Sequence, residues 1–462
     1  MAEQIPEALR IVEDENSMIR IMIFLLYYVV VCGPAIVASC AVDRGLLSSW
    51  SMTKAADLAA LIAIAVLSMQ FVLSARIRWI EWPFGLDRIM LFHRFMAISA
   101  VALLLAHPLL LAADPDGGYG WKLLCAFNFA GEGWKIIIGK AALIILLTTA
   151  IVSLFRLALK VEYQLWLRLH NILALCIIAG GFTHSILIGP HVSGNLPMKT
   201  LWVLYPAIAL GALFYNRFVR AAALKARAYR ISDVKKETNS VWTLSMTAPD
   251  NGPAYHYLPG QFHFITLFRA TDTRHEQHPF TISSSPAGTP GISSSIKESG
   301  DYTATIGKTV VGDRAALFGP FGRFSHTLYP SERNLVFIAG GIGITPFVSM
   351  LRHMRDTGDM RDMLLLYGNR KEKDIAFKNE LEEIAVKGVP HLRIVHVLDH
   401  ADENWSGERG HITIELIKKE CESLEGRVFY LCGPPIMMMG LVKNLKKARV
   451  KRGNIRYERF SI

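Results

Sequence analysis

The stretches FHRFMAISAVALLLAH (residues 92–107) and LHNILALCIIAGGFTH (residues 169–184) each place two histidines near the ends of an apolar segment. In both stretches the histidines are 14 positions apart. An α-helix rises 1.5 Å per residue with 3.6 residues per turn, so this spacing spans about 21 Å and almost four whole turns. Each pair therefore lies on nearly one helix face, with one imidazole at each of two depths.

Six apolar segments are long enough to cross a hydrocarbon core, which takes roughly 20 residues as helix. They are residues 19–42, 55–74, 88–112, 137–158, 165–188 and 200–217. The third and fifth segments cross in the same direction. This places His93 level with His170, and His107 level with His184.

Two facing imidazoles at each of two depths are suited to ligate one haem iron per level, as non-covalent b-type haems. The alternative is that each histidine only hydrogen-bonds a neighbouring helix. Two pairs of equal spacing on parallel segments favour the haem interpretation, because ionisable groups inside a membrane are costly and mark functional sites. The predicted metal ligands are therefore His93, His107, His170 and His184.

The composition supports a chain that lies partly in a membrane. It is 52% hydrophobic and 19% charged, whereas an average soluble domain is about 25% charged. The formal charge of +11 does not indicate nucleic-acid binding, because the basic residues concentrate at membrane borders. The six cysteines include no C-x-x-C pair, which argues against an iron–sulfur cluster, a zinc site or covalently attached haem.

Lysine and arginine near the ends of the apolar segments predict the orientation. They gather in loops 75–88 and 156–168 and after the sixth segment, at residues 217–230. Both termini are therefore expected in the cytoplasm, in a bacterial-type inner or plasma membrane. The first twenty residues lack the basic region of a signal peptide, so the first apolar run is expected to remain as a helix.

The pattern of apolar and turn residues differs between two parts of the soluble half. Residues 218–330 show short alternating segments and turn residues, which predict antiparallel strands. Residues 331–462 alternate apolar strand-like runs with helix-like stretches, which predicts a parallel sheet. The fold class is thus a multi-domain membrane protein with a cytoplasmic tail (1–18), a six-helix di-haem bundle (19–217), an antiparallel β-barrel and an α/β nucleotide-binding domain.

The membrane half resembles the domain shared by NADPH oxidases and ferric reductases. The resemblance rests on LDRIMLFHRF (86–95) and VEYQLWLRLHN (161–171), which surround the first histidine of each pair. In that family four histidines on the third and fifth helices hold two stacked haems. Eukaryotic oxidases carry a further histidine one turn beyond the outer ligand of the third helix, where this sequence has Leu111.

Residues 218–330 resemble the FAD-binding barrel of the ferredoxin-reductase superfamily, through LPGQFHFITLF (258–268), HPFTISSSP (278–286), SIKESGDYT (295–303) and GPFG (319–322). The resemblance implies that Thr281 hydrogen-bonds near the reactive nitrogen of the flavin. It also implies that Phe280 packs on the flavin and that His278 replaces an arginine. The implied FAD-binding residues are Gln261, His278, Pro279, Phe280, Thr281, Ser283, Ile296, Lys297, Thr303 and Gly322.

NLVFIAGGIGITPFVSMLRHM (334–354) predicts a strand, a glycine turn and a helix whose N-terminus favours a pyrophosphate. Its GGxGxTP pattern is the version found in the same superfamily, as are YLCGPPIMM (430–438) and the terminal RYERFSI. The resemblance places Cys432 beside the nicotinamide and Phe460 over the flavin ring. The implied nucleotide-binding residues are Gly340, Gly341, Gly343, Thr345, Pro346, Arg370, Cys432, Gly433 and Pro434.

The resemblance implies an NAD(P)H oxidase or ferric-chelate reductase with FAD, two haems b and NADPH or NADH as cofactors. Electrons would pass from cytoplasmic NAD(P)H across the lipid to dioxygen, giving superoxide, or to a ferric chelate. Arg370 favours NADPH, because a guanidinium grips a phosphate with two hydrogen bonds. The alternatives are a reductase that serves quinone or an extracytoplasmic redox protein, and a non-catalytic haem-binding sensor. The sequence contains no calcium-binding loop, and it leaves a monomer and a homo-oligomer open.

Overall fold

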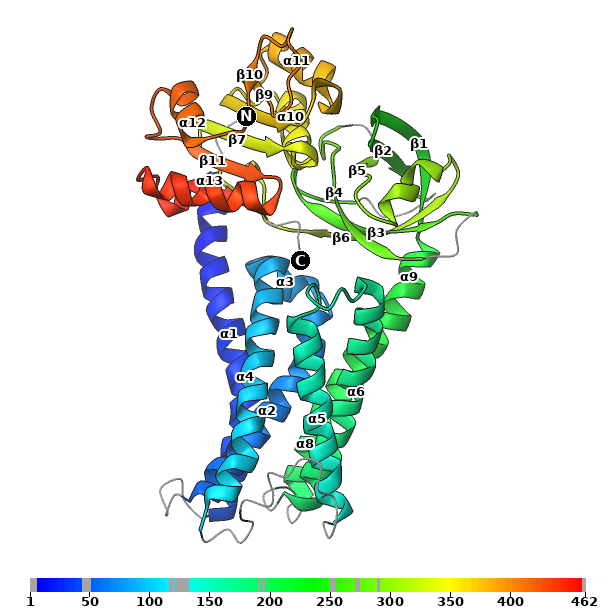
Figure 1. Cartoon of the computed structure of the whole chain (residues 1–462), viewed down its shortest axis with the longest axis vertical. Coiled ribbons are helices and arrows are strands. Elements are labelled where there is room, and N and C mark those ends of the chain that lie inside the picture. The colour runs from blue at the N-terminus through cyan, green and yellow to red at the C-terminus, as the bar shows by residue number, and fades with distance from the viewer. Residues whose placement is uncertain are drawn as a thin grey trace. The chain divides into compact units, whose positions relative to one another are not determined.

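The structure is a computed structural model that describes residues 6–43, 51–115, 120, 133–189, 192, 196–249, 255–270, 275–288 and 291–458. The chain forms two compact units. One consists of Glu15–Phe84 and Arg88–Arg220, and the other is built chiefly on Ala221–Ile462. Figure 1 shows long helices in the first unit and two sheets with their helices in the second.

Long apolar helices make up the first unit. Their bounds are α1 (Pro6–Asp43), α2 (Met52–Ser74), α4 (Leu86–Ala113), α5 (Trp134–Leu154), α6 (Tyr163–Ile188) and α8 (Leu196–Phe214). Among the described residues, six helices are long and apolar enough to cross a membrane. The six predicted helices are therefore confirmed, and the chain is an integral membrane protein.

The helix ends differ from the prediction in three places. α1 begins at Pro6 rather than at residue 19, because its polar first turns consist largely of good helix formers. A short helix, α3 (Arg78–Phe84), follows α2. The last span continues beyond α8 through a π-helical turn (Tyr215–Arg220) and α9 (Ala221–Ala226).

Small residues let these helices approach one another closely. In α2, Ala56, Ala63 and Ala65 are fully buried, as expected where helices pack inside a bilayer. Between α5 and α6, a Cβ built on Gly180 would lie 3.1 Å from the Cβ of Ala142. The close α5–α6 pair positions the outer histidine site described below.

The FAD-domain sheet has six antiparallel strands in the order β4-β3-β6-β1-β2-β5. Their bounds are β1 (Tyr229–Thr238), β2 (Val241–Thr247), β3 (Phe262–Phe268), β4 (Gln277–Thr281), β5 (Ile292–Lys297) and β6 (Arg314–Phe321). The predicted antiparallel domain is confirmed.

The sheet is not the closed barrel that the sequence predicted. Its edge strands β4 and β5 do not form a ladder; the segments beside them meet at an isolated bridge, Ile282–Ser294, and at a bond from the Ser283 amide to the Ser293 carbonyl, 2.7 Å. Beyond this point the hydroxyl of Ser284 accepts from the Ser293 amide. Serine side chains that bond the backbone compete with a strand ladder, so the sheet stays open here.

The nucleotide-binding domain has a parallel sheet in the order β10-β9-β8-β7-β11-β12. The strands are β7 (Asn334–Gly340), β8 (Asp362–Asn369), β9 (His391–Leu398), β10 (Glu408–Arg409), β11 (Val428–Cys432) and β12 (Ile455–Tyr457), with helices α10 (Thr345–Thr357), α11 (Lys378–Lys387), α12 (Ile414–Cys421) and α13 (Pro435–Lys447). The predicted parallel sheet is confirmed.

The strand order reverses between β7 and β11, because the chain moves from β7 to β8 on one side and returns to β11 on the other. In open α/β sheets, ligands bind at the carboxyl ends of the strands at such a switch point. Here those ends carry the glycine turn after Gly340 and the loop after Cys432.

Candidate functional site

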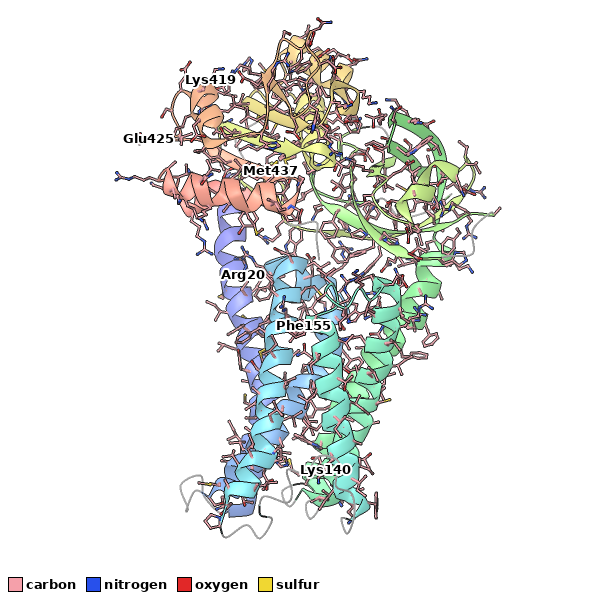
Figure 2. All side chains as sticks on the ribbon, in the orientation of Figure 1. Arg20, Lys140, Phe155, Lys419, Glu425 and Met437 are labelled. Atoms are coloured by element: carbon pink, nitrogen blue, oxygen red, sulfur yellow. The ribbon has the colours of Figure 1, made fainter. Side chains whose placement is uncertain are left out.

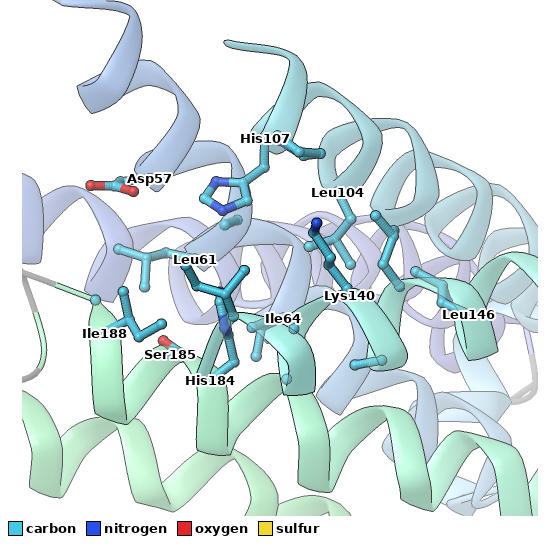
Figure 3. Close-up of a pocket in the computed structure, with 18 of the residues that line it drawn as sticks. Asp57, Leu61, Ile64, Leu104, His107, Lys140, Leu146, His184, Ser185 and Ile188 are labelled. Carbon is cyan, nitrogen blue, oxygen red and sulfur yellow. The ribbon is translucent and has the colours of Figure 1, made fainter. Parts of the chain in front are cut away.

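The outer histidines line one cavity in the membrane unit. Figure 3 shows His107, from α4, and His184, from α6, beside this cavity of about 270 Å³. The Nδ1 atom of His107 lies 2.9 Å from the Ala56 carbonyl oxygen, and that of His184 lies 2.9 Å from the Lys135 carbonyl oxygen. A carbonyl only accepts, so each Nδ1 donates and each Nε2 keeps a lone pair, the form that ligates metals.

The inner histidines are His93, from α4, and His170, from α6. The Nδ1 of His170 lies 3.3 Å from the Ser153 hydroxyl, which also accepts a bond from the indole N–H of Trp166, 3.2 Å. The Trp166 ring lies 5.2 Å from the imidazole of His170. The Nδ1 of His93 is buried without a hydrogen-bond partner in the described part of the chain.

Two charged side chains share the outer cavity. Asp57 and Lys140 line it together with Thr53 and Ser185. Figure 2 shows Lys140 toward one end of α5 and Phe155 at the other. The sequence analysis did not select Asp57 or Lys140, although each is a charge within an otherwise apolar segment.

The donor set fits a metal held between opposed imidazoles. The described residues contain no group of three or more His, Cys, Asp or Glu side chains arranged around a metal. A porphyrin supplies four iron ligands itself and needs only two axial side chains. Each histidine pair offers those two, and the outer pair presents both Nε2 lone pairs.

Some of the predicted flavin residues lie at the edge of the FAD sheet. Thr281 is buried at the carboxyl end of β4, and Phe280 before it is half-buried. The Nε2 of His278 donates to the Glu276 carboxylate at 2.9 Å, and its ring stacks on Tyr302 with centroids 4.0 Å apart. His278 and Phe280 lie on one face of β4, with ring centroids 6.3 Å apart, and the exposed Pro279 lies on the other.

Other predicted flavin residues bond within the protein. The side chain of Gln261 donates to the Gly322 carbonyl and accepts from the Leu258 amide. The Ser283 hydroxyl belongs to a buried serine network, and Ile296 packs in the sheet core. The Thr303 hydroxyl accepts from two backbone amides of its own turn, those of residues 299 and 300. These side chains shape the segment, so any contact with a flavin would use their backbone.

The glycine turn packs directly against the loop after β11. A Cβ on Gly343 would lie 2.3 Å from the Cys432 carbonyl oxygen, and one on Gly340 would lie 2.8 Å from Pro434 Cδ. A Cβ on Gly433 would likewise lie 3.0 Å from the Cα of Gly340. These glycines are therefore required by the contact between two loops.

Gly341 is the glycine of this turn that faces an open space. Its φ of +53° favours glycine, and the Nζ of Lys297 from the FAD domain lies 4.0 Å from where its Cβ would be. The Thr345 hydroxyl donates to the Ile342 carbonyl, and Pro346 follows in the first turn of α10. An ammonium beside a helix N-terminus favours an anion.

Cys432 is fully buried at the end of β11. Burial raises the pKa of its thiol well above the ordinary value, and the Glu458 carboxylate raises it further. The thiol therefore stays protonated at neutral pH.

Glu458 was missed by the sequence analysis, although it lies two positions before Phe460 in the terminal motif. Its carboxylate also lies near Gly322. Phe460 itself lies outside the described residues.

Arg352 joins the two nucleotide domains and was also missed. Its Nη1 donates to the Ser283 carbonyl at 2.8 Å, and Nε and Nη2 donate to the two oxygens of Glu380 at 2.7 Å. One turn earlier, the Ser349 hydroxyl donates to the Ser284 carbonyl, 2.7 Å. Helix α10 is thereby bonded to the HPFTISSSP segment.

Arg370 follows β8 and is exposed, as a residue that binds a diffusing nucleotide must be. Its carbonyl accepts from the His400 amide, 2.8 Å, which fixes the backbone at this position. Arg370 therefore follows the carboxyl end of β8, at the edge of the sheet that also carries Gly341 and Cys432.

Known families match three parts of the chain. Residues 59–181 match the family described as ferric reductase like transmembrane component, residues 227–335 match an FAD-binding domain, and residues 337–443 match an oxidoreductase NAD-binding domain. The chain thus combines a segment similar to a ferric-reductase-like transmembrane component with segments similar to an FAD-binding domain and an oxidoreductase NAD-binding domain.

Two curated relatives match part of this chain at moderate identity. The glycine betaine monooxygenase reductase subunit of Chromohalobacter salexigens is 30% identical over 223 residues, which are 47% of this chain and 59% of that protein. NADH-cytochrome b5 reductase 1 of Candida glabrata is 33% identical over 158 residues, 33% of this chain and 53% of that protein. The chain thus spans about half the length of the curated relatives that it matches.

Several solved structures match about half of this chain. The flavohem-like FAD/NAD-binding domain of nitric oxide dioxygenase from Vibrio cholerae is 22% identical, covered over 97% of its length, with a TM-score of 0.45. A ferredoxin NADP+ reductase from Neisseria gonorrhoeae with bound FAD and NADP is also 22% identical, covered over 97%, with a TM-score of 0.42.

Proposed function

We propose that the chain carries electrons across the membrane, from cytoplasmic NAD(P)H through FAD and two b-type haems to an acceptor on the far side. The acceptor is dioxygen, giving superoxide, or a chelated ferric iron. The observation that supports this best is the outer cavity, where His107 and His184 each present Nε2 while Nδ1 is bonded to a carbonyl. Both termini lie in the cytoplasm, on the side of the basic loops.

The residues divide the work along this route. Arg370 and the glycine turn at Gly341 would bind the nucleotide phosphates, Lys297 would bind the FAD pyrophosphate, and the buried Cys432 would border the nicotinamide. Bound FAD supplies the conversion of a hydride into single electrons, and haem iron supplies one-electron relay. His93 and His170 hold the inner haem, and His107 and His184 hold the outer one.

Anaerobic reduction tests the proposal. Purified protein with FAD is reduced with NADPH under argon, and the haem absorbance is followed after oxygen or ferric citrate is added separately. The proposal expects flavin bleaching, then a reduced-haem band, then reoxidation by one of the two acceptors. Haem that stays oxidised under NADPH, or protein without a Soret band, would contradict it.

Gly139 is predicted to position His184. A Cβ at Gly139 would lie 2.5 Å from Nδ1 of His184 and 2.6 Å from its Cε1, so Gly139→Ala must displace the imidazole. We expect a shifted outer-haem reduction potential and low-spin electron paramagnetic resonance signal, with the inner-haem signal unchanged. Gly211→Ala is the matched control, because a Cβ at that membrane-helix glycine meets nothing within 4 Å. Equal spectra for the two variants would remove Gly139 from the site.

Arg370 is predicted to select NADPH. Arg370→Ala removes a charge-assisted contact with the 2′-phosphate, so the KM for NADPH is expected to rise about tenfold while the KM for NADH stays constant. Lys373→Ala, at an exposed lysine of the same segment, should change neither. Steady-state measurements of the KM for NADPH and for NADH test this prediction. An equal rise of both KM values would assign Arg370 a structural role.

A further inference from the structure

The outward face of α13 combines apolar and basic side chains. Ile436 is 83% exposed and Met439 is 57% exposed. Lys443 and Lys447 follow on the same face, because residues three, four and seven apart share one side of a helix. Beside them lies a groove of about 780 Å³ that Met438, Met439, Val442, Lys443, Lys446, Lys447 and Tyr457 help to line.

The charge around this face has one sign. The sequence has no Asp or Glu between Glu425 and Glu458. Within that interval the basic residues near the end of α13 are Lys443, Lys446, Lys447, Arg449, Lys451 and Arg452. None of these six forms an ion pair with another described residue, so their charge is available to an external anion.

This face is separate from the nucleotide site. α13 begins at the carboxyl end of β11 and runs back along the sheet, so its lysines lie toward the opposite edge from Cys432 and Arg370. The lysine groove therefore has no part in the nucleotide binding proposed above.

We propose that this face of α13 docks on an anionic phospholipid surface. Helices that lie in a membrane interface carry Lys and Arg beside exposed apolar side chains, and clustered basic residues recognise anionic lipid headgroups. Lysine stems cover apolar surface while their ammonium groups reach the phosphates. The same chain carries six membrane-length helices, so the tether keeps this face at a high effective concentration of lipid.

Lysine labelling on the full chain tests the proposal. The protein is placed in nanodiscs of phosphatidylcholine alone or with phosphatidylglycerol, and is acetylated with a water-soluble ester that is quantified by mass spectrometry. With phosphatidylglycerol, labelling of Lys443, Lys446 and Lys447 is expected to fall about fivefold, the factor that one lysine near an anionic surface supplies. Molar salt should restore it, because charge screening then acts within a few ångströms.

Internal controls are present in the same sample. Lys236, Lys387 and Lys418 are exposed elsewhere on the soluble unit and should label equally in both nanodiscs. Ile436→Ser should weaken the protection, whereas Val386→Ser, at a residue that is 89% exposed, should not. Equal labelling of the α13 lysines in both lipids overturns the proposal, and leaves an acidic protein as the partner to test.

This result is independent of the electron-transfer proposal. Reduction of haem by NADPH is measured in the same nanodiscs. Protection without haem reduction would support lipid docking and contradict the proposed function, and haem reduction without protection would do the reverse.

Discussion

Replacing His107 or His184 with alanine should remove the outer haem and stop electron delivery to the far side. Each variant removes one of the two imidazoles that line the outer cavity. Loss of a mere supporting partner of a metal ligand costs about 10- to 100-fold in metal affinity or activity, and loss of the ligand itself should cost more. NADPH should still reduce the flavin and the inner haem under argon.

Pyridine haemochrome titration should find one haem per chain in these variants, against two in the parent. His93→Ala and His170→Ala serve as the complementary pair, with flavin reduction retained and no electron reaching the outer haem. His411→Ala, at a histidine whose side chain is 79% exposed in the soluble unit, is the control for histidine loss. Full haem content in all four ligand variants would end the di-haem proposal.

Gly343→Ala should block hydride transfer and leave the haem groups intact. The new Cβ would lie 2.3 Å from the Cys432 carbonyl oxygen and 2.6 Å from its carbonyl carbon. Both are backbone atoms, so the loop after β11, where the proposed function places the nicotinamide, must shift. A displacement of about 1 Å can slow a reaction roughly 100-fold, and we expect a loss of that size in stopped-flow reduction of flavin by NADPH.

Dithionite should still reduce both haems in Gly343→Ala, which would show that the membrane unit is folded. Gly440→Ala is the matched control, since this α13 glycine has nothing within 4 Å of its Cβ position. Alanine is also the better helix former there. A Gly343→Ala protein that reduces flavin at the parent rate would show that the contact between the two loops does not position the nicotinamide.

The fold could be predicted from the sequence where the apolar residues follow one clear pattern. Apolar length gave the six membrane helices, and alternating strand and helix patterns gave the parallel sheet. The polar start of α1 was missed because helix propensity without apolar character leaves no membrane signal. The open FAD sheet was missed because closure depends on which hydroxyls, such as that of Ser284, bond the opposite edge.

The candidate site was predicted as a set of positions, and less well as a set of contacts. A sequence motif does not reveal that both polar atoms of the Gln261 side-chain amide form hydrogen bonds with the protein's own backbone. Arg352 was missed because its partner Ser283 lies 69 positions away. Glu458 was missed because only the folded chain brings it near Cys432. The roles assigned to the FAD, nucleotide and haem residues remain predictions.

The two histidine levels differ in how they can be altered by substitution. The outer imidazoles are oriented by main-chain oxygens of Ala56 and Lys135, which every amino acid supplies. The inner imidazole of His170 is oriented by the Ser153 hydroxyl, which a single codon change deletes. A substitution at Ser153 would therefore remove the partner of His170 directly, whereas the outer imidazoles can be altered only through the packing around them, as at Gly139.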